Sequence, residues 1–124
     1  MVEFKGLRQV AQGVEDLDRA VAFYRDMLGL SFTARFDPPG LAFFDLGGTR
    51  LLLEQGAGTA VIYLEVDDVR DALDALRARG IAVHTEAHVV HRDDAGTFGP
   101  PGEDEWLGFV GDTEGNLVGL MSRG

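Results

Sequence analysis

The spacing of apolar residues in the first quarter of the chain predicts a helix over residues 17–28. Leu17, Val21 and Leu28 recur at intervals that place them on one face of a helix. Asp16 precedes this face as an N-cap, and Gly29 follows it as a residue that adopts the left-handed conformation at a helix end. Alternating or short apolar runs predict the strands of this half, which are 7–14, 30–36, 41–46 and 49–54.

The second half of the chain repeats this pattern. The segment Val14-Glu15-Asp16-Leu17 returns as Val66-Asp67-Asp68-Val69, where Asp67 or Asp68 caps a second helix that Gly80 ends. The turn Asp45-Leu46-Gly47-Gly48 has a counterpart in Asp112-Thr113-Glu114-Gly115. The strands expected around the second helix are 60–66, 81–91, 106–111 and 117–122. Both halves therefore follow the order β-α-β-β-β, which predicts an α+β fold.

One stretch, residues 92–105, is rich in Asp, Gly and Pro and shows no periodicity. A loop of this length in a small domain is either a functional lid or a disordered segment, and the sequence leaves both open. The 124 residues suffice for one domain.

Composition narrows the classes of partner. The chain has no cysteine, which excludes disulfides and thiolate metal sites. A net charge of −10 argues against nucleic acid and anionic membranes as partners, is compatible with a cationic ligand, and is also common in soluble proteins that bind nothing basic. Without a long apolar run or a signal-peptide pattern, we expect a cytoplasmic protein.

Two β-α-β-β-β units, together with Asp16-Leu17-Asp18-Arg19-Ala20-Val21-Ala22-Phe23-Tyr24-Arg25-Asp26-Met27-Leu28-Gly29, closely resemble the vicinal oxygen chelate superfamily. It includes glyoxalases, bleomycin resistance proteins, extradiol dioxygenases and methylmalonyl-CoA epimerase. The resemblance covers essentially the whole chain and implies a single domain over 1–124. Its two modules, about 5–56 and about 58–123, would form a curled mixed sheet around a cavity. Function does not follow from this fold alone.

The resemblance also indicates where a metal would lie. In metal-dependent members, the first and last strands of each module supply one ligand each, and the matching positions here are Gln9, Leu52, Val61 and Gly119. Leu, Val and Gly side chains donate no lone pair, and Gln9 alone offers one carbonyl oxygen. We therefore predict no metal at this site and no other cofactor, while a divalent metal held elsewhere stays open.

Histidines offer the alternative chemistry. His84 and His88 would lie about 13 Å apart in a strand, too far to share one ion. By alternation, His91 shares a face with Val83, Ala87 and Val89. His91 and Glu54 are therefore the candidate catalytic pair for acid–base chemistry without a metal, and Glu54 with one histidine is the candidate for a relocated metal.

Carried over from the family, the cavity face would be mostly apolar with a few polar groups, as in small-molecule pockets. The candidate pocket residues are Leu7, Gln9, Ala11, Leu52, Glu54, Val61, Tyr63, Trp106, Phe109, Gly119 and Met121. The first hypothesis is a homodimeric protein that binds a small organic molecule without the family metal. An enzyme of the same superfamily, acting as isomerase, lyase or dioxygenase, is the alternative, and an interaction domain without a small ligand is a third possibility.

Overall fold

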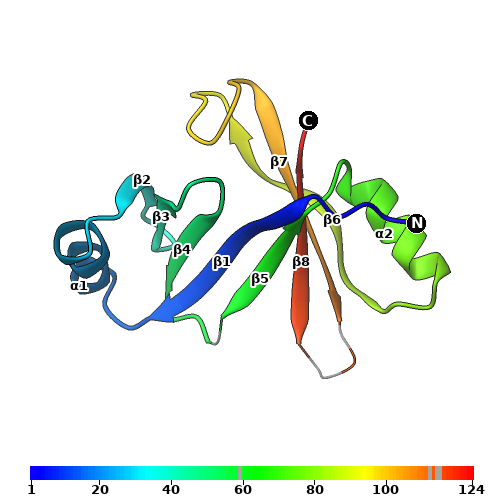
Figure 1. Ribbon diagram of the computed structural model, residues 1–124, viewed down its shortest axis with the longest axis horizontal. Helices are drawn as coiled ribbons and strands as arrows, with labels where there is room; N and C mark the ends of the chain where they lie inside the picture. Colours follow the sequence, from blue (N-terminus) through cyan, green and yellow to red (C-terminus); the bar gives the residue numbers. More distant parts are fainter. Residues whose placement is uncertain (59, 112, 114–115) are drawn as a thin grey trace. The chain divides into compact units, whose positions relative to one another are not determined.

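The computed structural model describes residues 1–58, 60–111, 113 and 116–124 (Figure 1). It divides into two units. The first-module unit is Arg8–Val61, and the second-module unit is Met1–Leu7 with Ile62–Gly124. The amino-terminal residues therefore belong with the second module, where the Lys5 N–H donates a hydrogen bond to the Glu65 carbonyl at 2.9 Å.

The first module has the predicted β-α-β-β-β order. Its strands are arranged β2-β3-β4-β1, with β1 and β4 parallel and the other neighbours antiparallel. The elements are β1 (Gly6–Val14), α1 (Leu17–Ala22), η1 (Phe23–Met27), β2 (Ser31–Phe36), β3 (Leu41–Asp45) and β4 (Arg50–Gln55).

The first helix differs from the single α-helix expected over 17–28. Asp16 caps it as predicted, accepting a hydrogen bond from the Arg19 N–H at 3.0 Å. From Phe23 onward the winding is that of a π-helix, in which the Leu28 N–H donates to the Phe23 carbonyl five residues earlier. The wider turn rotates Leu28 off the apolar face, so that its side chain is 54% exposed while Leu17 is 1% exposed.

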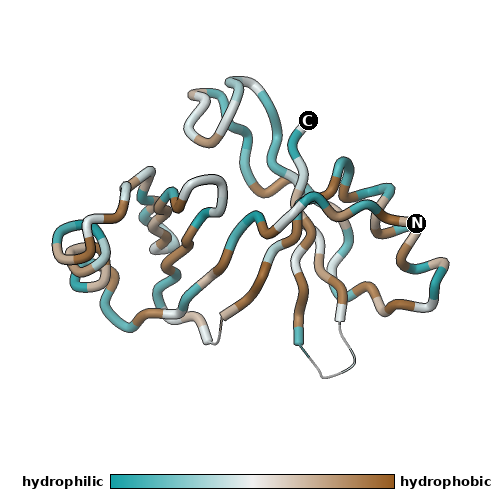
Figure 2. The backbone as a smooth tube through the Cα atoms, viewed as in Figure 1, coloured by the Kyte–Doolittle hydropathy of each residue, from teal (hydrophilic) through white to brown (hydrophobic). Residues whose placement is uncertain are grey.

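The core of this unit lies between α1 and one face of its sheet. Leu17 and Val21 pack against alternate residues of β3 and β4, so the residues between them face away from the helix. The buried members are Leu17, Val21, Ala42, Phe44, Leu51 and Leu53. Hydrophobic positions are concentrated in the strands and helices (Figure 2).

The second module repeats this topology. Its strands are arranged β5-β8-β7-β6, again with the first and last strands parallel. The elements are β5 (Val61–Glu65), α2 (Val69–Ala78), β6 (Val83–Asp93), β7 (Glu103–Gly111) and β8 (Leu117–Arg123). The predicted α+β fold of two β-α-β-β-β modules is confirmed.

Helix α2 covers one face of the second sheet. Of the two candidate caps, Asp68 is the one used, and it accepts a hydrogen bond from the Arg70 N–H at 2.8 Å. The Val69 N–H at the start of the helix donates to Ser122 Oγ on β8 at 3.1 Å. The core beneath the helix comprises Val66, Val69, Ala72, Leu73, Leu76, Val110 and Leu120.

The 92–105 stretch is more ordered than the sequence suggested. Strand β6 continues to Asp93 and β7 begins at Glu103, which leaves a turn of residues 94–102 between paired strands. Of the predicted closing turn, Asp112, Glu114 and Gly115 lie outside the described residues. In the described parts of the chain, no helix is long and apolar enough to cross a membrane.

The close packing of α2 on β7 generates a stability prediction. A Cβ added at Gly108 would lie 2.8 Å from Leu73 Cδ1 and 3.2 Å from the Thr85 carbonyl oxygen. We expect Gly108→Ala to lower the free energy of unfolding by about 1–3 kcal/mol, because a packed core resists added volume. Urea unfolding measures this, with Gly111→Ala on the same strand as control, since nothing lies within 4 Å of a Cβ there. Equal stability of the two variants would contradict the packing described.

Candidate functional site

The first-module face that turns away from α1 carries several of the candidate residues. Because Leu51 and Leu53 pack toward the helix, Arg50, Leu52 and Glu54 alternate onto the opposite face of β4. The parallel register pairs Gln9 with Arg50 and Ala11 with Leu52. Gln9, Ala11 and Leu52 are buried, whereas Arg50 and Glu54 are half-buried.

Gln9 and Arg50 form a fixed polar pair on this face. Arg50 Nε donates a hydrogen bond to Gln9 Oε1 at 3.0 Å. The guanidinium carbon lies 5.4 Å from the centre of the Phe43 ring, at the distance of a cation–π contact. The amide oxygen that would have been the one metal ligand on this strand therefore faces a cation.

On the second-module face that turns away from α2, an aromatic ring lies over Gly119, the last of the four family metal positions. Tyr63 on β5 pairs with Gly119 on β8, and a Cβ at Gly119 would overlap the Tyr63 ring. Phe109 meets the Tyr63 ring edge to face, with centroids 5.7 Å apart. Glycine at 119 is thus required by the ring that lies over it.

These four positions do not fit a divalent cation. The Gln9 oxygen accepts a hydrogen bond from a guanidinium. A side chain at 119 would have to displace Tyr63. Leu52 and Val61 have no donor atoms. Among the described residues, no group of three or more His, Asp or Glu side chains is placed to hold a metal elsewhere.

The remaining pocket candidates do not share one environment. Met121 is buried on the Tyr63 side of β8, Val61 is half-buried at the start of β5, and Leu7 is 43% exposed. Trp106 packs against the cluster beneath α2, with the Arg70 guanidinium 4.3 Å from its ring centre. The structure therefore separates Trp106 from Phe109, which lies on the opposite face of β7.

The alternation used to place His91 does not hold along β6. Register shifts fall between Thr85 and His88 and between Val89 and His91. Val83 and Ala87 pack against the core beneath α2. His91 instead lies with its Nε2 3.8 Å from Asp93 Oδ1 and its ring edge to face with Phe98. Irregular pairing thus separates residues that strict alternation had grouped.

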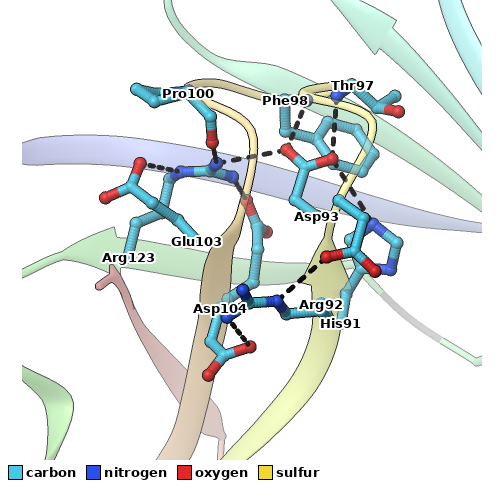
Figure 3. Close-up of polar contacts among 11 residues, drawn as sticks. His91, Arg92, Asp93, Thr97, Phe98, Pro100, Glu103, Asp104 and Arg123 are labelled. Atoms are coloured by element: carbon cyan, nitrogen blue, oxygen red, sulfur yellow. Dashed lines mark hydrogen bonds and ion pairs between the residues drawn. The ribbon is translucent and has the colours of Figure 1, made fainter.

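A buried charge cluster, missed by the sequence analysis, lies next to His91 (Figure 3). Asp93 and Glu105 are only 1% and 3% exposed. The Arg123 guanidinium donates to Asp93 Oδ2 at 3.1 Å, to Glu105 Oε2 at 2.5 Å and to Glu103 Oε1 at 3.4 Å. Three carboxylates therefore surround one guanidinium.

Asp93 also organises the turn that follows it. Its carboxylate accepts hydrogen bonds from the Thr97 N–H at 2.7 Å and the Phe98 N–H at 2.9 Å, and Arg123 Nη2 donates to the Pro100 carbonyl at 3.0 Å. Burial acts to raise the pKa of Asp93, but the hydrogen bonds from Phe98, Thr97 and Arg123 outweigh it and hold the pKa below its ordinary value.

The signal for this cluster in the sequence was local and incomplete. Asp93 is followed within four residues by Gly96 and Thr97, a composition typical of a turn closed by a carboxylate. The turn itself could therefore have been predicted from the sequence. The partner of Asp93 in the cluster, Arg123, lies thirty positions further along the chain, and nothing in their spacing indicates the contact.

Comparison with known proteins places this repeated fold in a recognised class. The model of the Glyoxalase/Bleomycin resistance protein/Dioxygenase superfamily matches residues 6–120. The chain belongs to this superfamily, as the resemblance predicted. No curated protein matches it.

Solved structures with the same fold include a hypothetical protein, an epimerase and a glyoxalase. A hypothetical protein from Bacillus halodurans has a TM-score of 0.73 and 16% identity, with 94% of this chain and 93% of that chain covered. Methylmalonyl-CoA epimerase from Mycobacterium tuberculosis has a TM-score of 0.69 and 19% identity, covering 96% and 88%. The Mn(II)-bound glyoxalase from Novosphingobium aromaticivorans has a TM-score of 0.71 and 25% identity, covering 98% of this chain but 40% of that one.

The charge cluster generates a second stability prediction. We expect Asp93→Asn to lower the free energy of unfolding by about 3 kcal/mol, because Arg123 loses a buried carboxylate and the turn loses charge-assisted hydrogen bonds. Asp94→Asn is the matched control, since its side chain is 79% exposed and we expect a change within about 0.5 kcal/mol. Urea unfolding at neutral pH compares the two variants.

The wild type and Asp93→Asn also test how the stability contributed by Asp93 depends on pH. Because the pKa of Asp93 is lower in the folded than in the unfolded chain, its contribution is fully present above the unfolded value, near 3.8. This stability is lost as the pH falls through the lower, folded value. The difference in stability between the wild type and Asp93→Asn should therefore shrink on acidification below pH 4, and a constant difference would contradict the assigned role.

Proposed function

We propose that this protein binds a small organic molecule and does so without the divalent cation of the metal-dependent superfamily members. The observation that carries the proposal is the first-module face, where the buried Gln9 is held by Arg50 beside Leu52 and Phe43. Such a surface, apolar with one oriented polar group, is characteristic of sites for small organic ligands.

The second-module face supports the same proposal. Tyr63, Phe109 and Met121 supply aromatic and flexible apolar surface of the kind that contacts organic ligands. Membership of the superfamily is consistent with binding or catalysis, and the donor set at the family metal positions favours binding without a metal.

A thermal-shift screen against metabolites and natural products, carried out in the presence of EDTA, tests this function. We expect at least one compound class to raise the melting temperature, since a ligand at 100 times its Kd contributes about 2.7 kcal/mol of stability. Retention of that shift in EDTA is the decisive result. A shift that appears only with added Mn²⁺, Ni²⁺, Zn²⁺ or Fe²⁺ would refute metal independence. We also propose that the protein is a homodimer, which light scattering on the same samples checks. We propose a cytoplasmic location for it.

A second candidate function is acid–base catalysis without a metal. The position of His91 Nε2, 3.8 Å from Asp93 Oδ1, favours it, because it sets an imidazole that can transfer protons beside a buried carboxylate. Glu54 stays the proposed partner and lies on β4 of the first-module unit.

Turnover of thioesters and hemithioacetals by the wild type and three variants tests this candidate. We expect His91→Asn and Glu54→Gln to lower kcat about 100-fold or more, as loss of a general acid or base does. His88→Asn, an exposed neighbour on the same strand, should leave kcat unchanged. Absence of turnover in the wild type, or equal rates in all variants, removes this candidate.

A further inference from the structure

An apolar cleft opens at the carboxyl-terminal end of α2, on the face of the second-module sheet that this helix covers. Its volume is about 620 Å³, and all the described residues that line it belong to the second-module unit. The floor of the cleft is formed by Leu76, Val110 and Leu120, which are members of the core beneath the helix. The cleft is therefore a place where this core can be reached from outside.

The cleft follows from the lengths of the helix and the strands. Helix α2 has ten residues and extends roughly 15 Å, whereas the nine residues of β7 extend roughly 30 Å. The helix begins beside Ser122, near the end of β8, and runs back toward the start of that strand. Val110 and Val118, which pair in register between β7 and β8, lie at that end of the sheet, and both line the cleft. The helix thus ends before the apolar positions of the sheet do.

Backbone hydrogen bonds fix one wall of the cleft, the connection from α2 to β6. The Ile81 N–H donates to the Leu76 carbonyl at 3.1 Å, which ties the connection to the helix. The Gly111 N–H donates to the Ala82 carbonyl at 3.1 Å, which ties it to β7. A ligand would meet this wall already formed, so little backbone ordering would oppose binding.

A further wall comes from the amino-terminal segment, which carries Phe4. Before Phe4, Val2 packs against the core beneath α2. After it, the Lys5 N–H donates to the Glu65 carbonyl at 2.9 Å, and Lys5 Nζ lies 2.7 Å from Asp67 Oδ1. Phe4 is held at the cleft between these two anchors, yet it is 47% exposed. Its ring therefore presents apolar surface to solvent at the mouth of the cleft.

The lining determines what kind of molecule fits. Thr113 is the one polar residue among the described residues that line the cleft, and none of these residues is charged. A charged ligand would lose hydration there without gaining an opposite charge from them. An apolar ligand would instead release water from half-buried side chains such as Leu64, Ile81 and Val118. The net charge of −10 further disfavours anions.

The size of the cleft indicates a small molecule rather than a protein. Sites for small molecules have volumes of about 300–1,000 Å³, and the cleft lies within that range. Eleven of the described residues line it, whereas a stable protein–protein interface uses about 20–30 residues on each side. A second copy of this chain would therefore find too little surface here for a stable contact.

We infer that this cleft is a second ligand site, which takes a neutral small molecule with a mainly hydrocarbon surface. Leu64 and Leu120 pack toward α2, whereas Tyr63 on the same sheet faces the other way. The cleft is therefore separate from the surfaces assigned to the proposed function, and the inference goes beyond that function.

Two fluorescent probes with the same anilinonaphthalene skeleton test the inference. Phenylnaphthylamine is neutral, and anilinonaphthalene sulfonate adds one negative charge. Both are titrated into the full chain, and the rise in fluorescence gives the Kd. The variants are Val118→Phe, which fills the cleft, and Phe4→Ala, which removes part of a wall. Their controls are Val90→Phe and Phe23→Ala, at residues that are 45% and 44% exposed and do not line the cleft.

We expect the wild type to bind phenylnaphthylamine and to bind the sulfonate about 10-fold more weakly or worse, because the charge must be desolvated. Val118→Phe should weaken binding of the neutral probe about 10-fold or more, since the added ring occupies the volume of the ligand. Phe4→Ala should weaken it about 2- to 10-fold, the range of one aromatic contact. Val90→Phe and Phe23→Ala should bind like the wild type.

Other results overturn the inference. Equal affinity of the wild type, Val118→Phe and Phe4→Ala for the neutral probe would assign its binding to another surface and leave the proposed function intact. Equal or tighter binding of the sulfonate would contradict a neutral ligand. Melting temperatures establish that each variant folds, and if Val118→Phe does not, the comparison of Phe4→Ala with Phe23→Ala decides. A molecular mass by light scattering that changes only in the cleft variants would assign the cleft to a second copy of the chain.

Discussion

The structure depends on one constraint, the parallel pairing of the first and last strands within each module. Parallel neighbours cannot be joined by a tight turn, so each pair needs a long connection, and in this chain a helix and two further strands lie between β1 and β4 and between β5 and β8. The pairing brings together residues that are distant in sequence. Gln9 meets Arg50, and Tyr63 meets Gly119. Each module therefore depends on contacts between residues that lie far apart in the sequence.

The two modules differ in which of the two parallel strands carries the larger side chain at the paired positions. In the first, a small Ala11 on the first strand faces the larger Leu52 on the last. In the second, the large Tyr63 is on the first strand and Gly119 on the last. Both arrangements fill the paired positions, because a close-packed interior conserves local volume rather than residue identity. Any side chain at 119, a metal ligand included, would conflict with that packing.

Much of the fold was predictable from the sequence because its signals are local. The caps Asp16 and Asp68 and the terminating glycines Gly29 and Gly80 act within one turn of the chain. The repeat then supplied the topology of the second half from that of the first. The π-helical winding after Ala22 was not predictable, because the same apolar residues suit either winding until the sheet they pack against is known.

The candidate site was less predictable, since its contacts depend on strand register. Along β1 and β4, which pair without interruption, alternation placed Gln9, Leu52 and Glu54 on one face. Along β6, the register shifts broke the alternation on which the placement of His91 relied. The pairing of His91 with Glu54 and the cavity itself stay predictions.

The 94–102 turn shows why composition alone does not determine order. Asp, Gly and Pro occur in both rigid and disordered turns, since they favour tight backbone conformations in either case. What fixes this turn is the buried Asp93 carboxylate, which accepts two backbone N–H bonds and the Arg123 guanidinium (Figure 3). The guanidinium lies close to the backbone at Gly99, where a Cβ would be only 2.9 Å from the Arg123 Cζ atom. The charge cluster thus closes this turn through hydrogen bonds beside His91, whose ring contacts Phe98 within the turn.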